Sequence, residues 1–298
     1  MSCGINVTRI RQGSYVVGLL LAVAGPAAEI RVVGSDLLGP DFARAVALFS
    51  QQNDVAVKLD LRGTRPGAEE LSAKRADLGL FLLPAGENPP ADALTSRVIA
   101  YQVAAVVVSA ASPLKQVTIP QLRGIFSGSS GEAFTRWGEL NLIGAWTSRP
   151  IALRALAPSA GLAFPLFQQV ILAGAAARPA LEFAATPEAV IQRLQATDNS
   201  IGVIGLPAGE LPGLRVLSLA ASPSDPAFGP TPEQVHRGNY PLRLPLQVTF
   251  RREAAAELQL LLKFLLSDEA AAALAPAFFL PLPPGARNQL VFELEEMR

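Results

Sequence analysis

Ile30-Arg31-Val32-Val33-Gly34-Ser35-Asp36-Leu37-Leu38-Gly39-Pro40 opens a pattern that the rest of the chain repeats. Its first four residues are mostly apolar and predict a short strand that ends at the polar turn 34–36. Apolar residues then recur at the spacing of one helix face, at Leu38, Phe42, Val46 and Phe49. We therefore expect a strand–loop–helix unit whose free backbone N–H groups suit an anion or a polar ligand. The alternative is that Ser35 or Asp36 only caps the helix.

Two further polar loops follow predicted strands. Residues 55–61 (VAVKLDL) alternate apolar and polar side chains, as a half-buried strand does, and lead into a loop with Thr64 and Arg65. The strand at 151–156 ends in a loop that contains Ser159 and precedes another helix. This order predicts a parallel sheet with helices on its faces. Ligands of such sheets lie beyond the carboxyl ends of the strands, where these loops are.

The composition narrows the possible functions. The chain has 298 residues, half of them hydrophobic and 17% charged, and its formal net charge is zero. This length suits one large domain or two lobes, and the balanced charge offers no surface for nucleic acid. Cys3 is the only cysteine and His236 the only histidine, so an exported chain would lack thiol chemistry and a His-rich zinc site. We expect His236 to be a surface loop residue.

The N-terminus has the layout of a secretory signal peptide. Arg9 and Arg11 precede the apolar run 15–25, and small residues follow it up to Ala28. The run is too short to span a bilayer comfortably, which favours cleavage near residue 28. The alternative is an uncleaved membrane anchor. We therefore expect residues 1–28 to direct the mature chain to the periplasm.

Several phrases of the sequence, taken in order, resemble the periplasmic phosphate-binding proteins of ABC importers, the PstS-like family. The first are Gly34-Ser35-Asp36, Gly63-Thr64 with Gly67, and Ala76-Asp77-Leu78-Gly79. The next are 122–128 (LRGIFSG) followed by Trp137, and 200–203 (SIGV). The last are 240–242 (YPL) and 264–269 (FLLSDE), which lead to 279–282 (FLPL). The series covers nearly all of residues 30–284.

The resemblance implies an α/β fold of the type II periplasmic-binding kind. Two α/β lobes would be joined by two crossing strands, with a ligand held in the cleft between them. The first lobe would be discontinuous, at residues 29–103 plus 244–298, and the second would span residues 104–243. The expected partners are a small solute and the membrane subunits of an ABC importer. The expected protein is a monomer without a cofactor that closes by hinge motion.

The chain departs from this family at the ligand site. The resemblance implies a phosphate site of loop donors, an arginine and an aspartate, yet Leu82 stands at the aspartate position and Leu156 at the arginine position. The family's Ser-Gly-Thr loop is replaced by 160–162 (AGL). Each missing charged hydrogen bond costs about 1.5–3 kcal/mol of binding free energy. Arg65 and Arg154 are possible replacements, or else solvated surface charges. The candidate ligand-binding residues are Ser35, Asp36, Leu37, Thr64, Arg65, Arg154, Ser159 and Gly161.

Three functional hypotheses follow. The first is an exported solute-binding protein that binds a small anion such as phosphate, or another small polar solute, and catalyses no reaction. The second is a binding-fold protein that has lost its small ligand and serves as an envelope scaffold or interaction protein. Leu82, Leu156 and Leu162 favour it, and it predicts a cleft filled by side chains. The third is a secreted hydrolase, which would need paired carboxylates or an activated serine, and the sequence has no G-x-S-x-G motif.

Overall fold

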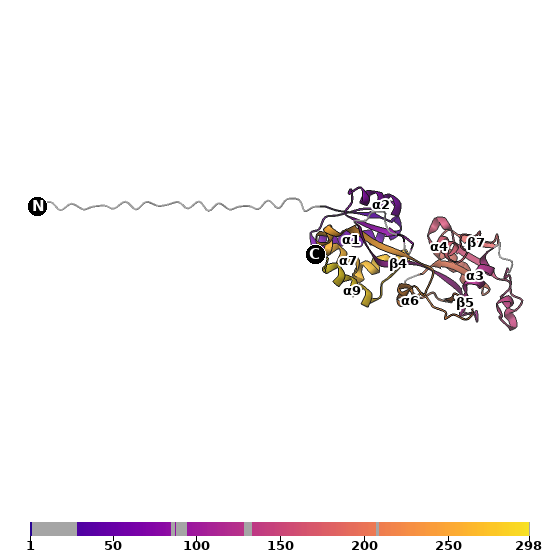
Figure 1. Ribbon diagram of the computed structural model, residues 1–298. Coiled ribbons are helices and arrows are strands. Elements are labelled where there is room, and N and C mark those ends of the chain that lie inside the picture. The colour runs from indigo at the N-terminus through magenta and orange to yellow at the C-terminus, as the bar shows by residue number, and fades with distance from the viewer. Residues whose placement is uncertain (2–28, 85–86, 88–93, 128–132, 207–208, 298) are drawn as a thin grey trace.

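The computed structural model describes residues 1, 29–84, 87, 94–127, 133–206 and 209–297. Apart from its first residue, the predicted leader at 1–28 lies outside this part of the chain. None of the described helices combines the length and the apolar character that a membrane span requires. Figure 1 shows an elongated molecule with two lobes, one around α1, α2, α7 and α9 and the other around α3, α4 and β7.

The first lobe contains the segment that begins at residue 29 and the C-terminal segment up to residue 297, so indigo and yellow ribbons lie together in Figure 1. Its sheet has the parallel strands β2, β1 and β3 in that order, and β11 pairs antiparallel with β3. The strands are β1 (Ile30–Gly34), β2 (Val57–Asp60), β3 (Leu78–Leu82), β11 (Arg243–Arg251) and β12 (Phe279–Pro281). The helices are α1 (Gly39–Asn53), α2 (Thr64–Ser72), α7 (Ala255–Leu265), α8 (Asp268–Leu274) and α9 (Pro284–Glu295). Short 3-10 turns are η1 (Asp36–Leu38), η5 (Arg252–Ala254) and η6 (Ala275–Ala277).

The long strand β4 (Leu94–Ser109) runs through both lobes. Its first part, residues 94–103, pairs with β11 and β12, and its second part, residues 104–109, pairs with β8 and β9. The strand β11 then carries the chain back into the first sheet. We propose lobe boundaries at 29–103 plus 244–298 and at 104–243, which the change of strand partners supports.

The second lobe repeats the strand–loop–helix arrangement. Its sheet has parallel strands in the order β7–β6–β8, with β4 antiparallel to β8, and a separate parallel pair of β5 and β10. The strands are β5 (Gln116–Thr118), β6 (Ala152–Leu156), β7 (Leu181–Ala184), β8 (Ser200–Gly205), β9 (Leu214–Val216) and β10 (Ser218–Ala220). The helices are α3 (Ile119–Phe126), α4 (Ala163–Val170), α5 (Pro187–Gln195) and α6 (Pro232–Arg237). The 3-10 turns are η2 (Trp137–Leu140), η3 (Gly144–Trp146) and η4 (Pro158–Ala160).

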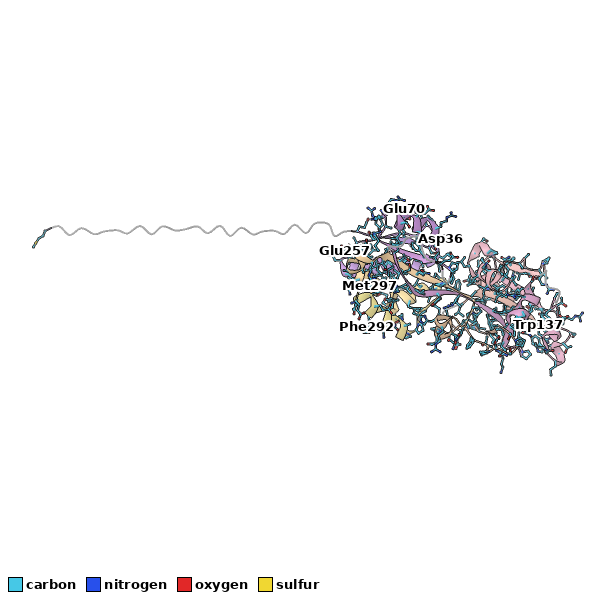
Figure 2. All side chains as sticks on the ribbon, viewed as in Figure 1. Asp36, Glu70, Trp137, Glu257, Phe292 and Met297 are labelled. Carbon is cyan, nitrogen blue, oxygen red and sulfur yellow. The ribbon has the colours of Figure 1, made fainter. Side chains whose placement is uncertain are left out.

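Local sequence explains where these helices begin. The Thr118 hydroxyl accepts a hydrogen bond from Gln121 N, and the Gln121 side chain accepts one from Thr118 N, which forms a capping box at α3. Thr186 caps α5 in the same way through its hydroxyl. Trp137 is fully buried in the second lobe, where Figure 2 labels it, and it belongs to the hydrophobic core.

The sequence of residues 207–240 is rich in Pro and Gly, which predicts loop. This prediction was wrong, because the described part of the region contains β9, β10 and α6. His236 is exposed as expected, yet it lies in the last turn of α6 and not in a loop. These elements have only three to six residues each, which is too short for a hydrophobic period to be recognised.

Candidate functional site

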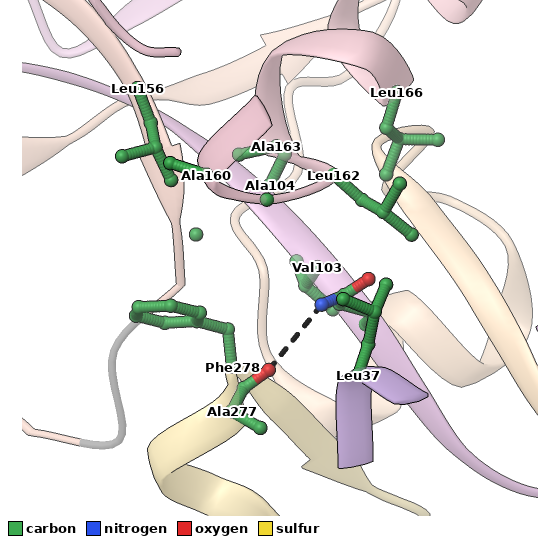
Figure 3. A pocket seen from close by; sticks show the side chains of 13 residues that line it. Leu37, Val103, Ala104, Leu156, Ala160, Leu162, Ala163, Leu166, Ala277 and Phe278 are labelled. Carbon is green, nitrogen blue, oxygen red and sulfur yellow. Dashed lines mark hydrogen bonds between the residues drawn. The ribbon is translucent and has the colours of Figure 1, made fainter. Parts of the chain in front are cut away.

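A cavity of about 150 Å³ lies between the lobes, where loops from both meet the middle of β4 (Figure 3). The first lobe contributes η1 and the corner between η6 and β12. The second lobe contributes η4 and the start of α4. The largest side chains that line the cavity are Leu37, Gln102, Leu156, Leu162, Leu166 and Phe278. Every lining residue in the described part of the chain is uncharged, and Gln102 is the one polar side chain among them.

The loop after β1 forms one wall of the cavity. Ser35 is only 2% exposed, and its hydroxyl accepts a hydrogen bond from Leu37 N at 3.2 Å, so it caps η1. The Ser35 N–H donates to Leu80 O at 2.9 Å, which ties the loop to β3. Leu37 directs its side chain to the cavity (Figure 3), whereas Asp36 is exposed (Figure 2). Of the three candidates in this loop, Leu37 alone lines the cavity.

The loop after β2 does not reach the cavity. Thr64 begins α2, and its hydroxyl accepts a hydrogen bond from Leu82 N at 3.1 Å. This bond satisfies a backbone donor at the end of β3. Arg65 is exposed, and neither Thr64 nor Arg65 lines the cavity. The Thr64 hydroxyl therefore stabilises the fold, and the Arg65 side chain is exposed to solvent.

The loop after β6 forms the opposite wall. Leu156 ends the strand with 2% exposure and lines the cavity, together with Gly161. Arg154 lies two residues earlier and forms an ion pair with Glu182 of β7, with 2.9 Å between Nη1 and Oε1. The two residues are paired across β6 and β7. Ser159 is exposed and, like Arg154, does not line the cavity.

Phe278 and Gln102 were not predicted as site residues. Phe278 has a φ of 65°, and its ring packs against Gly205, where an added Cβ would lie 2.5 Å from the ring carbon Cγ. Gln102 is 8% exposed and donates from Nε2 to Ala277 O at 3.4 Å, the dashed line in Figure 3. The available signal for Gln102 was one polar side chain inside the apolar run 98–109. No comparable signal marks Phe278, because it belongs to an apolar segment.

Tyr240 fastens the crossing region next to the cavity. The side chain is fully buried, and its hydroxyl donates to Ala104 O at 2.9 Å. Burial raises the pKa of Tyr240 well above its ordinary value, so the hydroxyl keeps its proton and remains a donor. Ala104 lines the cavity, so this bond holds β4 in place at the point where the lobes meet.

The described residues hold no group of three or more His, Cys, Asp and Glu side chains that could bind a metal ion. The charged candidates also do not meet: Arg65 is exposed, and Arg154 is paired with Glu182. Among the described residues, those that line the cavity are apolar apart from one amide, and they include no nucleophile or acid–base pair.

The sequence is similar to that of a phosphate-binding protein. It is 23% identical over 291 residues to the phosphate-binding protein PstS of Pseudomonas aeruginosa, and the match covers 91% of this chain and 88% of that protein. No protein-family profile matches the chain.

The fold is shared with solved structures. A possible phosphate binding protein from Planctomyces limnophilus superimposes with a TM-score of 0.69 at 20% identity, over 92% of this chain and 99% of that one. An ABC-type phosphate transport receptor from Vibrio cholerae gives a TM-score of 0.67 at 18% identity, over 86% of this chain and 100% of that one. The predicted type II periplasmic-binding fold and the resemblance to PstS-like proteins are thereby confirmed.

Proposed function

We propose that the protein is an exported solute-binding protein that holds a small solute between its two lobes and presents it to the membrane subunits of an ABC importer. The observation that carries this proposal is the cavity of about 150 Å³, which lies between the lobes and is lined by residues from both. A ligand there would contact both lobes at once and so favour the closed arrangement. The names of the similar proteins support a transport role.

The geometry favours an uncharged solute over phosphate. A buried dianion needs several donors, and a charge without them is expelled from an apolar site. Of the candidate ligand-binding residues, only Leu37 and Gly161 line the cavity, and neither supplies a side-chain hydrogen-bond donor. Phosphate therefore enters the proposal through the similar proteins, and the cavity itself supports a small solute of low charge.

The scaffold hypothesis predicted a cleft filled by side chains. Leucines and Phe278 do narrow the cleft, but they leave room for a small molecule. This remaining volume is the reason to prefer the solute-binding proposal.

Isothermal titration of the full chain with phosphate, sulfate, phenol and benzene tests the proposal. We expect at least one of them to bind with one-to-one stoichiometry. Binding should weaken tenfold or more in the variant Ala160→Leu, because Ala160 lines the cavity and the larger side chain fills it. Ala196→Leu is the matched control, because Ala196 is exposed at the end of α5 and away from the cavity.

Absence of measurable binding for all four solutes at millimolar concentration would overturn the proposal. So would binding that Ala160→Leu leaves unchanged, since the solute would then lie elsewhere.

A further inference from the structure

The cavity offers a solute almost no polar side chain to bond with. Gln102 is the one polar side chain that lines the cavity in the described part of the chain. Its Nε2 atom donates to Ala277 O at 3.4 Å, and its Oε1 atom is buried and out of reach of a solute. A hydroxyl group placed in the cavity would therefore lose its bond to water and gain no acceptor from a described side chain.

The remaining wall is apolar and comes from both lobes. Leu37 and Phe278 belong to the first lobe, and Leu156 and Leu162 to the second (Figure 3). The volume is about 150 Å³, and an apolar cavity of this size lined by such side chains binds benzene. None of the described lining residues is charged, so a charged solute would stay in water. The geometry therefore matches an apolar molecule of about one benzene ring.

Phe278 is the part of this wall that reaches across the lobe boundary. Its N–H donates to Ala275 O at 3.0 Å, and its carbonyl accepts from Val103 N at 3.4 Å, so its backbone is held in the first lobe. Its ring lies on Gly205 of β8 in the second lobe, where an added Cβ would lie 2.5, 2.8 and 2.9 Å from three ring atoms. The glycine thus leaves the space that the ring occupies.

The backbone of Phe278 is also unusual. Its φ of 65° is in the left-handed region, which is rarely adopted by a residue with a bulky side chain and which costs backbone strain. The ring is only half-buried, so packing in the core does not explain why a phenylalanine stands there. Because the ring lines the cavity, it determines how large a solute can be.

We propose that the cavity binds an apolar molecule about the size of a benzene ring, and that Phe278 sets the upper limit of its size. This proposal rests on the proposed solute-binding function and specifies the class of solute and the residue that selects it. Benzene is the simplest molecule of that class. Phenol is the same body with a hydroxyl group, and naphthalene is an apolar body with one more ring.

Titration of the full chain with benzene, phenol and phosphate tests the solute class. We expect benzene to bind about tenfold more tightly than phenol, because the phenol hydroxyl leaves water without gaining an acceptor side chain. Benzene binding should also have a negative heat-capacity change, the sign of apolar surface removed from water. Benzene binding should weaken in Ala160→Leu, which places the solute in this cavity.

Titration of Phe278→Ala with benzene and naphthalene tests the size limit. The variant removes one ring from the cavity wall, so the ratio of naphthalene affinity to benzene affinity should rise tenfold or more over wild type. Phe278→Leu is the second variant, in case alanine leaves too little packing on Gly205 for the chain to fold. It should raise the ratio in the same direction by a smaller factor.

Phe292→Ala is the matched control. Phe292 lies in α9 with 66% exposure, away from the cavity, so its removal should leave the ratio unchanged. The ratio compares two solutes on one folded variant, so a loss of stability alone does not alter it. An unchanged ratio in both Phe278 variants would overturn the role of Phe278 as the size limit.

The titrations separate this proposal from the solute-binding function. Phenol binding as tightly as benzene, or phosphate binding more tightly than benzene, would overturn the apolar-ligand proposal while the solute-binding function stands. No binding of benzene, phenol, phosphate or sulfate would overturn both.

Discussion

The two loops that face each other across the cavity, 34–38 in the first lobe and 157–161 in the second, both follow a parallel strand and precede a helix. The first is held by polar contacts: Ser35 caps η1, and its N–H bonds to β3. The second presents mainly small apolar side chains, and its serine, Ser159, is exposed. The two loops therefore occupy equivalent positions in the fold, but they offer different chemical groups to a ligand.

This contrast shows that two loops at matching places in a fold can take different roles. In the first loop the polar groups serve the backbone, so their loss would damage the fold. Among the described residues of the second loop no polar side chain lines the cavity, and the flanking Leu156 and Leu162 do line it. Substitutions at matched positions in the two loops can break or sharpen this comparison.

The largest difference is expected for the glycines. A Cβ at Gly34 would lie 2.1 Å from Leu80 O, a backbone atom that cannot move without disturbing β3. A Cβ at Gly161 would lie 3.2 Å from the flexible end of Leu156. We expect Gly34→Ala to lower the free energy of unfolding by roughly 4 kcal/mol or more, and Gly161→Ala by about 1–3 kcal/mol from backbone strain. Urea unfolding of both variants measures the difference, and equal losses would contradict it.

A smaller difference is expected for the serines. Ser35→Ala removes the hydroxyl that accepts from Leu37 N, and the loss of such a cap costs about 1 kcal/mol. Ser159→Ala should change stability by less than about 0.5 kcal/mol, because Ser159 is exposed. The same unfolding experiment compares them. A larger loss for Ser159→Ala would mean that the second loop depends on its polar residue after all.

The smallest effect is expected at the ion pair behind the second loop. Glu182 is more than half exposed, so Glu182→Gln should cost less than about 1 kcal/mol, and the cost should shrink as salt is added. Because Arg154 does not line the cavity, phosphate titration should give the same result in this variant as in wild type. A gain of phosphate binding would show that Arg154 reaches the cavity once it is released from Glu182.

Much of the fold could be predicted from the sequence because strands, polar loops and helices alternate in a regular order. The alternation at 55–61 predicted β2, and the strand predicted at 151–156 is β6. The short strands of the region 207–240 were not predicted, because three residues are too few to establish a hydrophobic period.

The candidate site could be predicted only in part. Leu37 and Gly161 line the cavity. Arg154 does not line it, although residues two positions apart on a strand, such as Arg154 and Leu156, point to the same face of the sheet. A residue two positions from a strand end lies about 7 Å back along the sheet, and Arg154 meets Glu182 across the strands at that depth. The role of Ser35 was also undecided, since a serine after a strand can cap a turn or bind a ligand, and only geometry separates the two. Gln102 is the opposite case, because it lines the cavity but was not predicted as a site residue. Its position as a polar residue inside an apolar run was the signal that could have identified it.

The strand order has a consequence for how the newly made chain matures. In the first lobe β11 lies between β3 and β4, and α1 packs on α8. The N-terminal segment therefore cannot complete its pairing and packing until residues near the other end of the chain have been synthesised. Synthesis proceeds from the N-terminus, so the continuous second lobe is complete before β11 emerges. During that interval the edge of β3 has no partner, and nascent chains are then most prone to join edge to edge.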